Sequence, residues 1–148
     1  MKRRFLRRAA DERGVALIEA AITLPLLLLI SVSIFEFGRA YQHWQVLTNA
    51  SREGARIAVL PNVNDAAVTA RVRSYLAAGQ LASPANAAVV VDRGAQISIG
   101  TGTAPASRVT VRYPFEFMVL EPVAQLVVSG STAGRPITIT AATTMRNE

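Results

Sequence analysis

Apolar side chains fill residues 15–35, VALIEAAITLPLLLLISVSIF, where Glu19 is the single charge among 21 residues. At about 1.5 Å per residue, such a helix is long enough to cross a bilayer core of about 30 Å. The pattern therefore predicts a transmembrane helix over residues 15–35. Pro25 predicts a kink in it, because proline removes a backbone donor and crowds the preceding turn. Thr23 is a candidate donor to the carbonyl that Pro25 leaves unpaired.

The helical pattern continues beyond residue 35 and ends near Pro61. Apolar or small side chains recur every three or four residues, at Phe37, Tyr41, Trp44, Leu47, Ser51, Ala55 and Ala58. We expect one continuous helix over about residues 15–60, whose outer half forms a stalk. Its stripe should bury against a folded domain, with stalk packing through Phe37, Tyr41, Trp44 and Leu47.

Two alternatives concern the aromatic and charged positions of this stalk. Tyr41 and Trp44 could form a belt at the membrane interface, but core packing is favoured because the stripe continues to Ala58. Arg39, Arg52, Glu53 and Arg56 could form a recognition patch, but a solvated helix face is favoured. On that face Arg39 can reach Glu36 and Arg56 can reach Glu53, each three residues away.

Shorter elements follow in the remaining chain. Asn64 or Asp65 can cap a second helix over residues 66–78, which Gly79 closes. Its predicted buried face carries Val68, Val72, Tyr75 and Leu76. Strand-like segments at residues 88–92, 96–99, 108–113 and 137–143 are separated by expected turns at Arg93-Gly94 and at residues 100–102.

Residues 115–128 are apolar but too short to span, and Glu121 and Pro122 interrupt them. They predict either a short amphipathic helix or a connection that lies on the sheet. The expected fold class is α+β, with a long N-terminal transmembrane helix that continues as a stalk packed on a small antiparallel sheet. The corresponding domains are a basic leader (residues 1–14), the transmembrane helix (residues 15–35) and an extracytoplasmic domain (residues 36–148).

The distribution of charge predicts the topology. Residues 1–13 carry six basic and two acidic side chains, against ten and eight from Val15 onward. Basic residues beside a span stay in the cytoplasm, which predicts a single-pass protein with its N-terminus inside and its C-terminus outside. A cleaved signal peptide is an alternative, with Ser31 and Ser33 as exit-site residues, but the apolar run exceeds the usual length. Nucleic-acid binding is disfavoured, because no aromatic residues interleave with basic ones outside the leader.

Candidate chemistry is sparse. The chain has no cysteine and a single histidine. We therefore expect His43 to be a surface residue rather than a metal ligand. We also expect no metal, no cofactor and no small-molecule substrate. No arrangement typical of a catalytic triad, a carboxylate pair or a phosphate-binding loop occurs, so we expect a protein that is not an enzyme.

Glu19 is the strongest candidate for function. A carboxylate within a membrane costs at least about 2.5–3.5 kcal/mol without a partner, so such residues are functional by default. Two alternatives stay open. Glu19 lies one turn inside the segment and could reach water, or it could pair with an amine at Val15, four residues earlier. Gly14 precedes the segment directly and could equally be a flexible residue or a processing site.

Three segments resemble the TadE family of pilus assembly proteins, the minor pilin-like components of type IVb (Flp, tight adherence) systems. The first segment is RGVALIE at residues 13–19, which leads into the apolar run. It is similar to that family's motif of a glycine followed, five positions later, by a glutamate. FGRAYQHWQVLTNASREGARIA at residues 37–58 is similar to its stalk signature, and ITITAATTMR at residues 137–146 to its closing strand. The stalk-signature residues are Gly38, Arg39, Asn49, Arg52, Glu53, Gly54 and Arg56.

The resemblance implies a minor pilin-like (pseudopilin) component needed to assemble a Flp/Tad pilus. It implies cleavage between Gly14 and Val15 by a prepilin peptidase, with Glu19 then pairing with the freed amine of a neighbouring subunit. Other pilins and the inner-membrane assembly platform are the implied partners. The alternative is a membrane-anchored periplasmic scaffold that never enters the fibre. Ala20 departs from the phenylalanine that often follows this glutamate in major Flp pilins.

Overall fold

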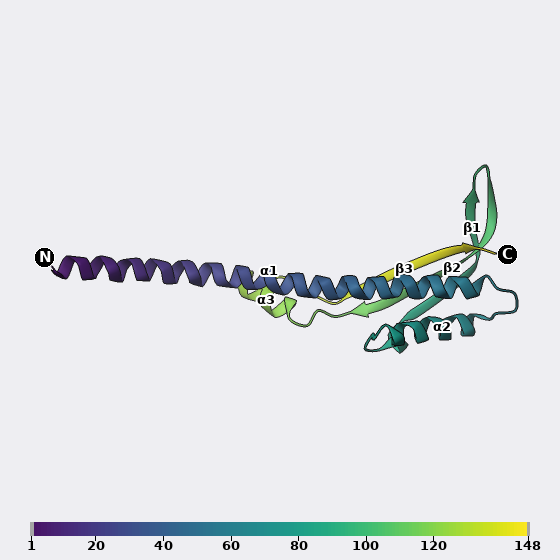
Figure 1. Ribbon diagram of the computed structural model, residues 1–148, viewed down its shortest axis with the longest axis horizontal. Coiled ribbons are helices and arrows are strands. Elements are labelled where there is room, and N and C mark those ends of the chain that lie inside the picture. The colour runs from purple at the N-terminus through teal and green to yellow at the C-terminus, as the bar shows by residue number, and fades with distance from the viewer. Residues whose placement is uncertain (1, 148) are drawn as a thin grey trace. The chain divides into compact units, whose positions relative to one another are not determined.

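A computed structural model describes the backbone of residues 2–147 and the side chains of residues 14–147. The elements, labelled in Figure 1, are α1 (Lys2–Ala58), α2 (Asp65–Ala78), a short 3-10 helix (Pro84–Asn86), β1 (Ala88–Ile99), β2 (Gly102–Phe115), α3 (Leu120–Val127) and β3 (Ile137–Arg146). The α+β fold class is confirmed, with a long N-terminal apolar helix and a small antiparallel sheet.

The chain forms two compact units. One contains the part of α1 up to Phe37 together with Phe117–Arg135, which includes α3. The other contains Gly38–Glu116 and the chain from Pro136 onward, and so holds the outer part of α1, α2 and the sheet. The boundaries at residues 14 and 35 remain predictions.

Helix α1 is longer than the sequence pattern predicts at its start and slightly shorter at its end. It begins at Lys2, within the basic leader, and ends at Ala58. The helix continues through Pro25. The hydroxyl of Thr23 donates to the carbonyl of Glu19 at 2.9 Å. Thr23 therefore does not pair with the carbonyl of Ala21, four residues before Pro25, and that expectation was wrong.

The sheet has the strand order β1-β2-β3, and both pairings are antiparallel. The central strand β2 alternates between buried and exposed residues, as a strand with one covered face does. Its buried apolar side chains are Ala104, Ala106, Val109, Val111, Tyr113 and Phe115. With buried residues of the outer part of α1 and of α2, they form the core of this unit.

The expected turn at Arg93-Gly94 was wrong, because β1 runs through both residues. The register with β2 shifts between Asp92 and Ala95, which is a β-bulge. The amide of Gly94 donates to Asp92 Oδ1 at 2.9 Å within it. The turn at residues 100–102 does occur, where Gly100 has a φ of +64° between β1 and β2.

Helix α2 matches the predicted second helix closely. The side chain of Asn64 accepts a hydrogen bond from the amide of Ala67 at 2.8 Å, and Gly79 follows the last turn. Val68, Val72 and Leu76 are buried, whereas Tyr75 is exposed. The sequence therefore placed Tyr75 on the wrong face, because Tyr75 directly precedes Leu76 on the helix and lies beside the buried stripe.

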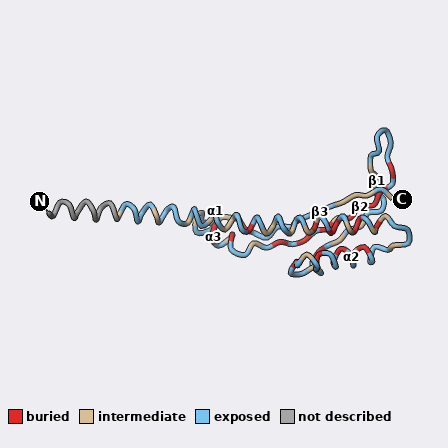
Figure 2. Tube along the Cα trace, in the orientation of Figure 1, coloured by how far each residue is buried: buried red, intermediate tan, exposed pale blue. Residues whose placement is uncertain are grey.

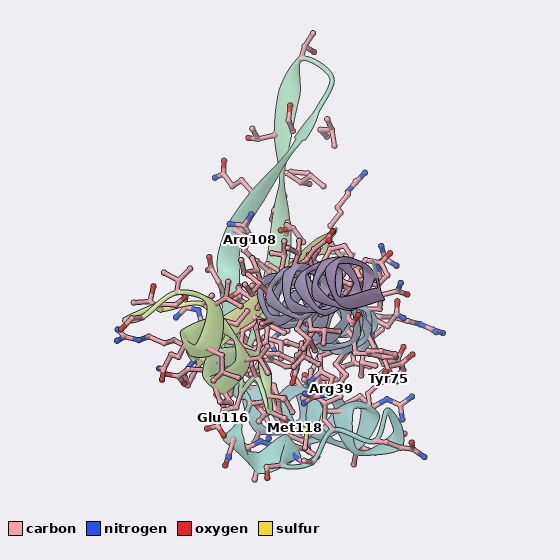
Figure 3. All side chains as sticks on the ribbon, turned by 90° about the vertical axis from the view of Figure 1, so that its left-hand side faces the viewer. Arg39, Tyr75, Arg108, Glu116 and Met118 are labelled. Carbon is pink, nitrogen blue, oxygen red and sulfur yellow. The ribbon has the colours of Figure 1, made fainter. Side chains whose placement is uncertain are left out.

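Helix α3 realises the amphipathic alternative for the apolar segment before β3. Leu120, Val123 and Ala124 are buried, whereas Leu126 is exposed. Figure 1 and Figure 3, which looks along α1 from its N-terminal end, both place α3 beside α1. Gly134 packs onto the start of α3, since an added Cβ would collide with the backbone of Leu120 and Glu121.

Candidate functional site

The inner part of α1 is a candidate membrane span with an exposed surface. Gly14–Ala58 contains a window of mean hydropathy 2.4, and none of that window is buried. Val15, Leu17, Ile18, Ile22 and Leu24 are all exposed. Figure 2 shows this exposure along the described start of the helix. An apolar helix surface of this length is typical of a segment covered by lipid or by other helices.

Glu19 lies on this exposed surface. Among the described residues, no side chain is bonded to its carboxylate. The exposed positions around it are apolar, and its backbone carbonyl accepts from Thr23. Within this chain the carboxylate is therefore presented outward, where water, a lipid headgroup or a neighbouring subunit could reach it.

The glycines of the helix separate into two kinds. A Cβ added at Gly54 would lie 2.6 Å from Val72 Cγ2 and 3.2 Å from Val109 Cγ1, so this glycine allows α2 and β2 to approach α1. An added Cβ at Gly14 or at Gly38 would meet nothing within 4 Å. Glycine within a helix costs roughly 0.5–1 kcal/mol relative to alanine. Packing among the described residues therefore explains Gly54 but not Gly14 or Gly38.

Small buried residues lie between the signature residues in the segment 37–58. Ala50, Ser51 and Ala55 have no exposed surface, and Ala58 is almost fully buried. The hydroxyls of Ser51 and Thr143 lie 2.7 Å apart, which joins α1 to β3. These small side chains let the sheet and α2 pack closely on the helix.

The charged residues of the signature near the end of α1 are partly or fully exposed, and Glu53 is paired with a residue of α2. Glu53 Oε1 accepts from Arg71 Nη2 at 2.7 Å and from Arg71 Nε at 3.1 Å. Among the described residues, Glu53 thus pairs with Arg71 on α2 rather than with the expected Arg56. Arg52 donates to Asn49 Oδ1 at 3.4 Å, a marginal contact.

Arg39 has a packing role that the sequence analysis missed. Its guanidinium lies 5.1 Å above the ring of Phe115, the last residue of β2. This cation–π distance is within the range that stabilises such pairs. Arg39 therefore packs over the end of the central strand β2.

The expected packing of three aromatic residues in the core was wrong. Phe37, Tyr41 and Trp44 keep 58%, 59% and 44% of their surface exposed, whereas Leu47 has none exposed. Tyr41 and Trp44 contact each other, with ring centroids 5.7 Å apart. The buried face of the stalk is centred on Leu47, and at about 100° per residue Tyr41 lies roughly 120° around the helix from it.

His43 is a packed residue and not the surface residue that the sequence predicted. Its ring centroid lies 5.1 Å from that of Phe115 and 5.8 Å from that of Tyr113, both edge to face. Its Nδ1 is buried and has no hydrogen-bond partner among the described groups. Burial lowers the pKa of His43 below 6.5, and the neighbouring charge of Arg39 lowers it further.

Glu36 is a second carboxylate that the sequence analysis paired only with Arg39. It is 4% exposed, although it directly follows the apolar segment. Its Oε1 accepts from the backbone amides of Met118 and Val119, each at 2.9 Å. The rings of Phe37 and Phe117 touch beside it, with centroids 5.8 Å apart. Glu36 thereby fastens the start of α3 to the end of the apolar segment.

A shallow pocket of about 540 Å³ lies where α1 ends, beside the start of the α1–α2 loop. Its lining includes Glu53, Arg56, Arg71, Met145 and Arg146. Within the part of the chain that the structure describes, no group of three or more metal-ligating side chains occurs. The pocket is therefore a charged surface hollow without a catalytic or metal-binding arrangement.

These features define a class: a chain with one candidate membrane helix that continues as the packed stalk of an α+β domain. Residues 14–56 match the family model described as TadE-like protein. The match begins at Gly14 and covers the apolar segment, Glu19 and the stalk signature through Arg56. The resemblance to the TadE-like family is thus confirmed over these residues. Comparison with curated proteins and with solved structures found no match.

Proposed function

We propose that this protein is a single-pass, minor pilin-like subunit that acts in assembling a Flp/Tad-type pilus and catalyses no reaction itself. The observation that carries the proposal is the extent of the family match. The match begins at Gly14 and ends at Arg56, within the stalk signature, so it joins the candidate span and the stalk in one segment. A TadE-like segment of this composition belongs at a membrane where pili are assembled.

The proposed processing step removes the basic leader. A prepilin peptidase, supplied by another chain, cleaves between Gly14 and Val15. Gly14 has no packing role in the described chain, which supports a role in recognition instead. The mature subunit would begin with the amine of Val15, at the inner end of the apolar segment.

The proposed assembly step uses the exposed carboxylate of Glu19. In the bilayer, this group pairs with the freed amine of a neighbouring subunit, which neutralises both charges and sets the axial register. The outward position of Glu19 supports an intermolecular partner, although Val15 of the same chain is also within helical reach. Other pilins and the inner-membrane platform are the proposed partners.

The test of processing is the intact mass of the membrane-extracted protein, produced with and without an active prepilin peptidase. The expected mature chain begins at Val15. A chain that retains Met1 in the presence of the active peptidase would contradict the pilin-like proposal.

The test of assembly compares Glu19→Gln and Glu19→Ala, with Ser31→Gln as a matched polar change elsewhere in the span. Both Glu19 variants should be processed but should be missing from sheared extracellular fibres, whereas Ser31→Gln should be retained. Normal assembly of both Glu19 variants would reject the pairing. Absence of the wild-type protein from fibres that form only in its presence would favour a membrane-anchored scaffold.

A further inference from the structure

We propose that α3 and its flanking residues, the segment 117–128, insert into the outer leaflet of the membrane beside the span, as an interfacial anchor. The proposal rests on the membrane insertion of α1 in the proposed function. It concerns the first compact unit alone, which holds the apolar part of α1 and Phe117–Arg135.

The depth of the segment 117–128 in the membrane follows from its contact with Glu36. This residue is the first after the apolar run, so it marks the outer boundary of the span. Because its carboxylate binds the amides of Met118 and Val119 at 2.9 Å, the start of α3 is held at the same boundary. The ring contact between Phe37 and Phe117 holds the chain there as well.

Helix α3 also lies along the apolar run itself. Leu29, Val32 and Ser33 are partly buried in a part of α1 where most residues are exposed, and buried Glu36 follows them at helical spacing on the same side. The facing side of α3 buries Leu120, Val123 and Ala124. Figures 1 and 3 agree that α3 lies side by side with this part of α1.

The other side of the segment is apolar and uncovered. Met118 and Leu126 are 73% and 74% exposed, and Val119 and Val128 are also exposed. Ile34 and Phe35, at the end of the apolar run of α1, are exposed as well. Residues 117–128 carry a single charge, Glu121. An apolar surface joined to a membrane span is covered at least cost by the same lipid, as in helices that lie in the membrane interface.

The backbone of the segment is suited to this environment. Amides that face lipid must be bonded within the protein. Glu36 accepts from the amides of Met118 and Val119, and the amides of Val123 and Val128 bond to the carbonyls of Val119 and Ala124 at 3.2 and 2.9 Å. The polar residues that follow, SGSTAGR at residues 129–135, suit the headgroup layer.

The absence of native cysteine allows single-cysteine labelling of the full chain without background. Leu126→Cys carries a nitroxide, in nanodiscs of phosphatidylglycerol and phosphatidylethanolamine loaded with one copy each. Ile22→Cys, on the span, is the lipid control, and Ser98→Cys, exposed on β1, is the aqueous control. All three positions are exposed in the fold, so the label displaces no core side chain.

The expected result is that the Leu126 nitroxide relaxes with oxygen and is protected from a water-soluble nickel chelate, as at Ile22 and opposite to Ser98. Relaxation by nickel at Leu126 with protection at Ile22 would overturn this inference and leave the proposed span intact. Relaxation by nickel at both sites would overturn the span and the inference together. Protection at Leu126 only in vesicles holding many copies would identify a second copy as the covering surface and overturn the lipid assignment.

Discussion

The guanidinium of Arg93 donates from Nη1 to the carbonyl of Ala58 at 2.8 Å, which ties the bulge of β1 to the last residue of α1. The same side chain donates to the carbonyl of Val63 at 2.7 Å and to Asp65 Oδ1 at 2.9 Å. One planar side chain thus fixes the end of α1, the connecting loop and the start of α2. The bulge at Asp92–Ala95 gives Arg93 its position in the strand.

Arg93→Ala should destabilise the second unit by about 1–3 kcal/mol, because hydrogen bonds to a charged group are lost and the group is partly screened by solvent. Arg93→Lys should recover only part of this, since an ammonium cannot reproduce the guanidinium geometry. In the detergent-solubilised Arg93→Ala variant, amide hydrogen exchange should increase most, relative to the wild type, at the end of α1 and the start of α2. Equal stability of the lysine variant and the wild type would contradict a geometric role.

Gly54 and Gly38 provide a matched pair of substitutions in one helix. Gly54→Ala should destabilise by about 1–3 kcal/mol, since the new methyl would collide with Val72 and Val109. Gly38→Ala has free space and should stabilise the helix by about 0.5–1 kcal/mol. Chemical unfolding of both variants, followed by circular dichroism, tests the sign of each effect.

Gly38→Ala has a second readout in the cell. Because no packing in the described chain requires glycine there, a loss of pilus assembly by this more stable variant would indicate that another subunit approaches the helix closely at that position. Stable protein with unchanged assembly would leave Gly38 without a functional role.

Local chemistry predicted much of this fold. The cap at Asn64, the closure at Gly79 and the turn at Gly100 depend on neighbouring residues, and the sequence contains them. The bulge at Arg93 could not be predicted, because a bulge is defined by the register with β2, far along the chain. The sequence therefore favoured a turn at Arg-Gly.

Helical periodicity predicted that one side of the stalk is buried but placed the buried face incorrectly. Large aromatic residues suggested its centre, whereas the close approach of β2, β3 and α2 selects small residues such as Ala50 and Ala55. The Glu36 contact was missed for a related reason. Its partners are backbone amides 82 and 83 residues away, and backbone groups leave no sequence signal.

Leu47 and Trp44 test the corrected face of the stalk. Leu47→Ala should destabilise by about 2–5 kcal/mol, the range for a fully buried leucine. Trp44→Ala should cost only about 0.5–1.5 kcal/mol, mainly the contact with Tyr41. Denaturant midpoints of the two variants decide the order, and a larger loss for Trp44→Ala would restore the aromatic core that the sequence suggested.

His43 predicts a pH dependence of stability. Burial and the charge of Arg39 lower its folded pKa, whereas the unfolded chain should titrate near about 6.5. Between the two pKa values the unfolded state binds more protons, so the stabilising contribution is complete above about pH 6.5. It falls as the pH decreases through this value toward the folded pKa.

The measurement is the unfolding free energy of the detergent-solubilised chain at pH values from 8 to 5, for the wild type and for His43→Phe. Phenylalanine keeps a ring against Phe115 and Tyr113 but binds no proton, so its stability should vary less over this range. The difference between the two proteins should grow as the pH falls below about 6.5, and solvent screening of the partly exposed imidazole limits its size. Parallel pH curves for the two proteins would show that the protonated imidazole is accommodated in the fold, contrary to the burial of its unpartnered Nδ1.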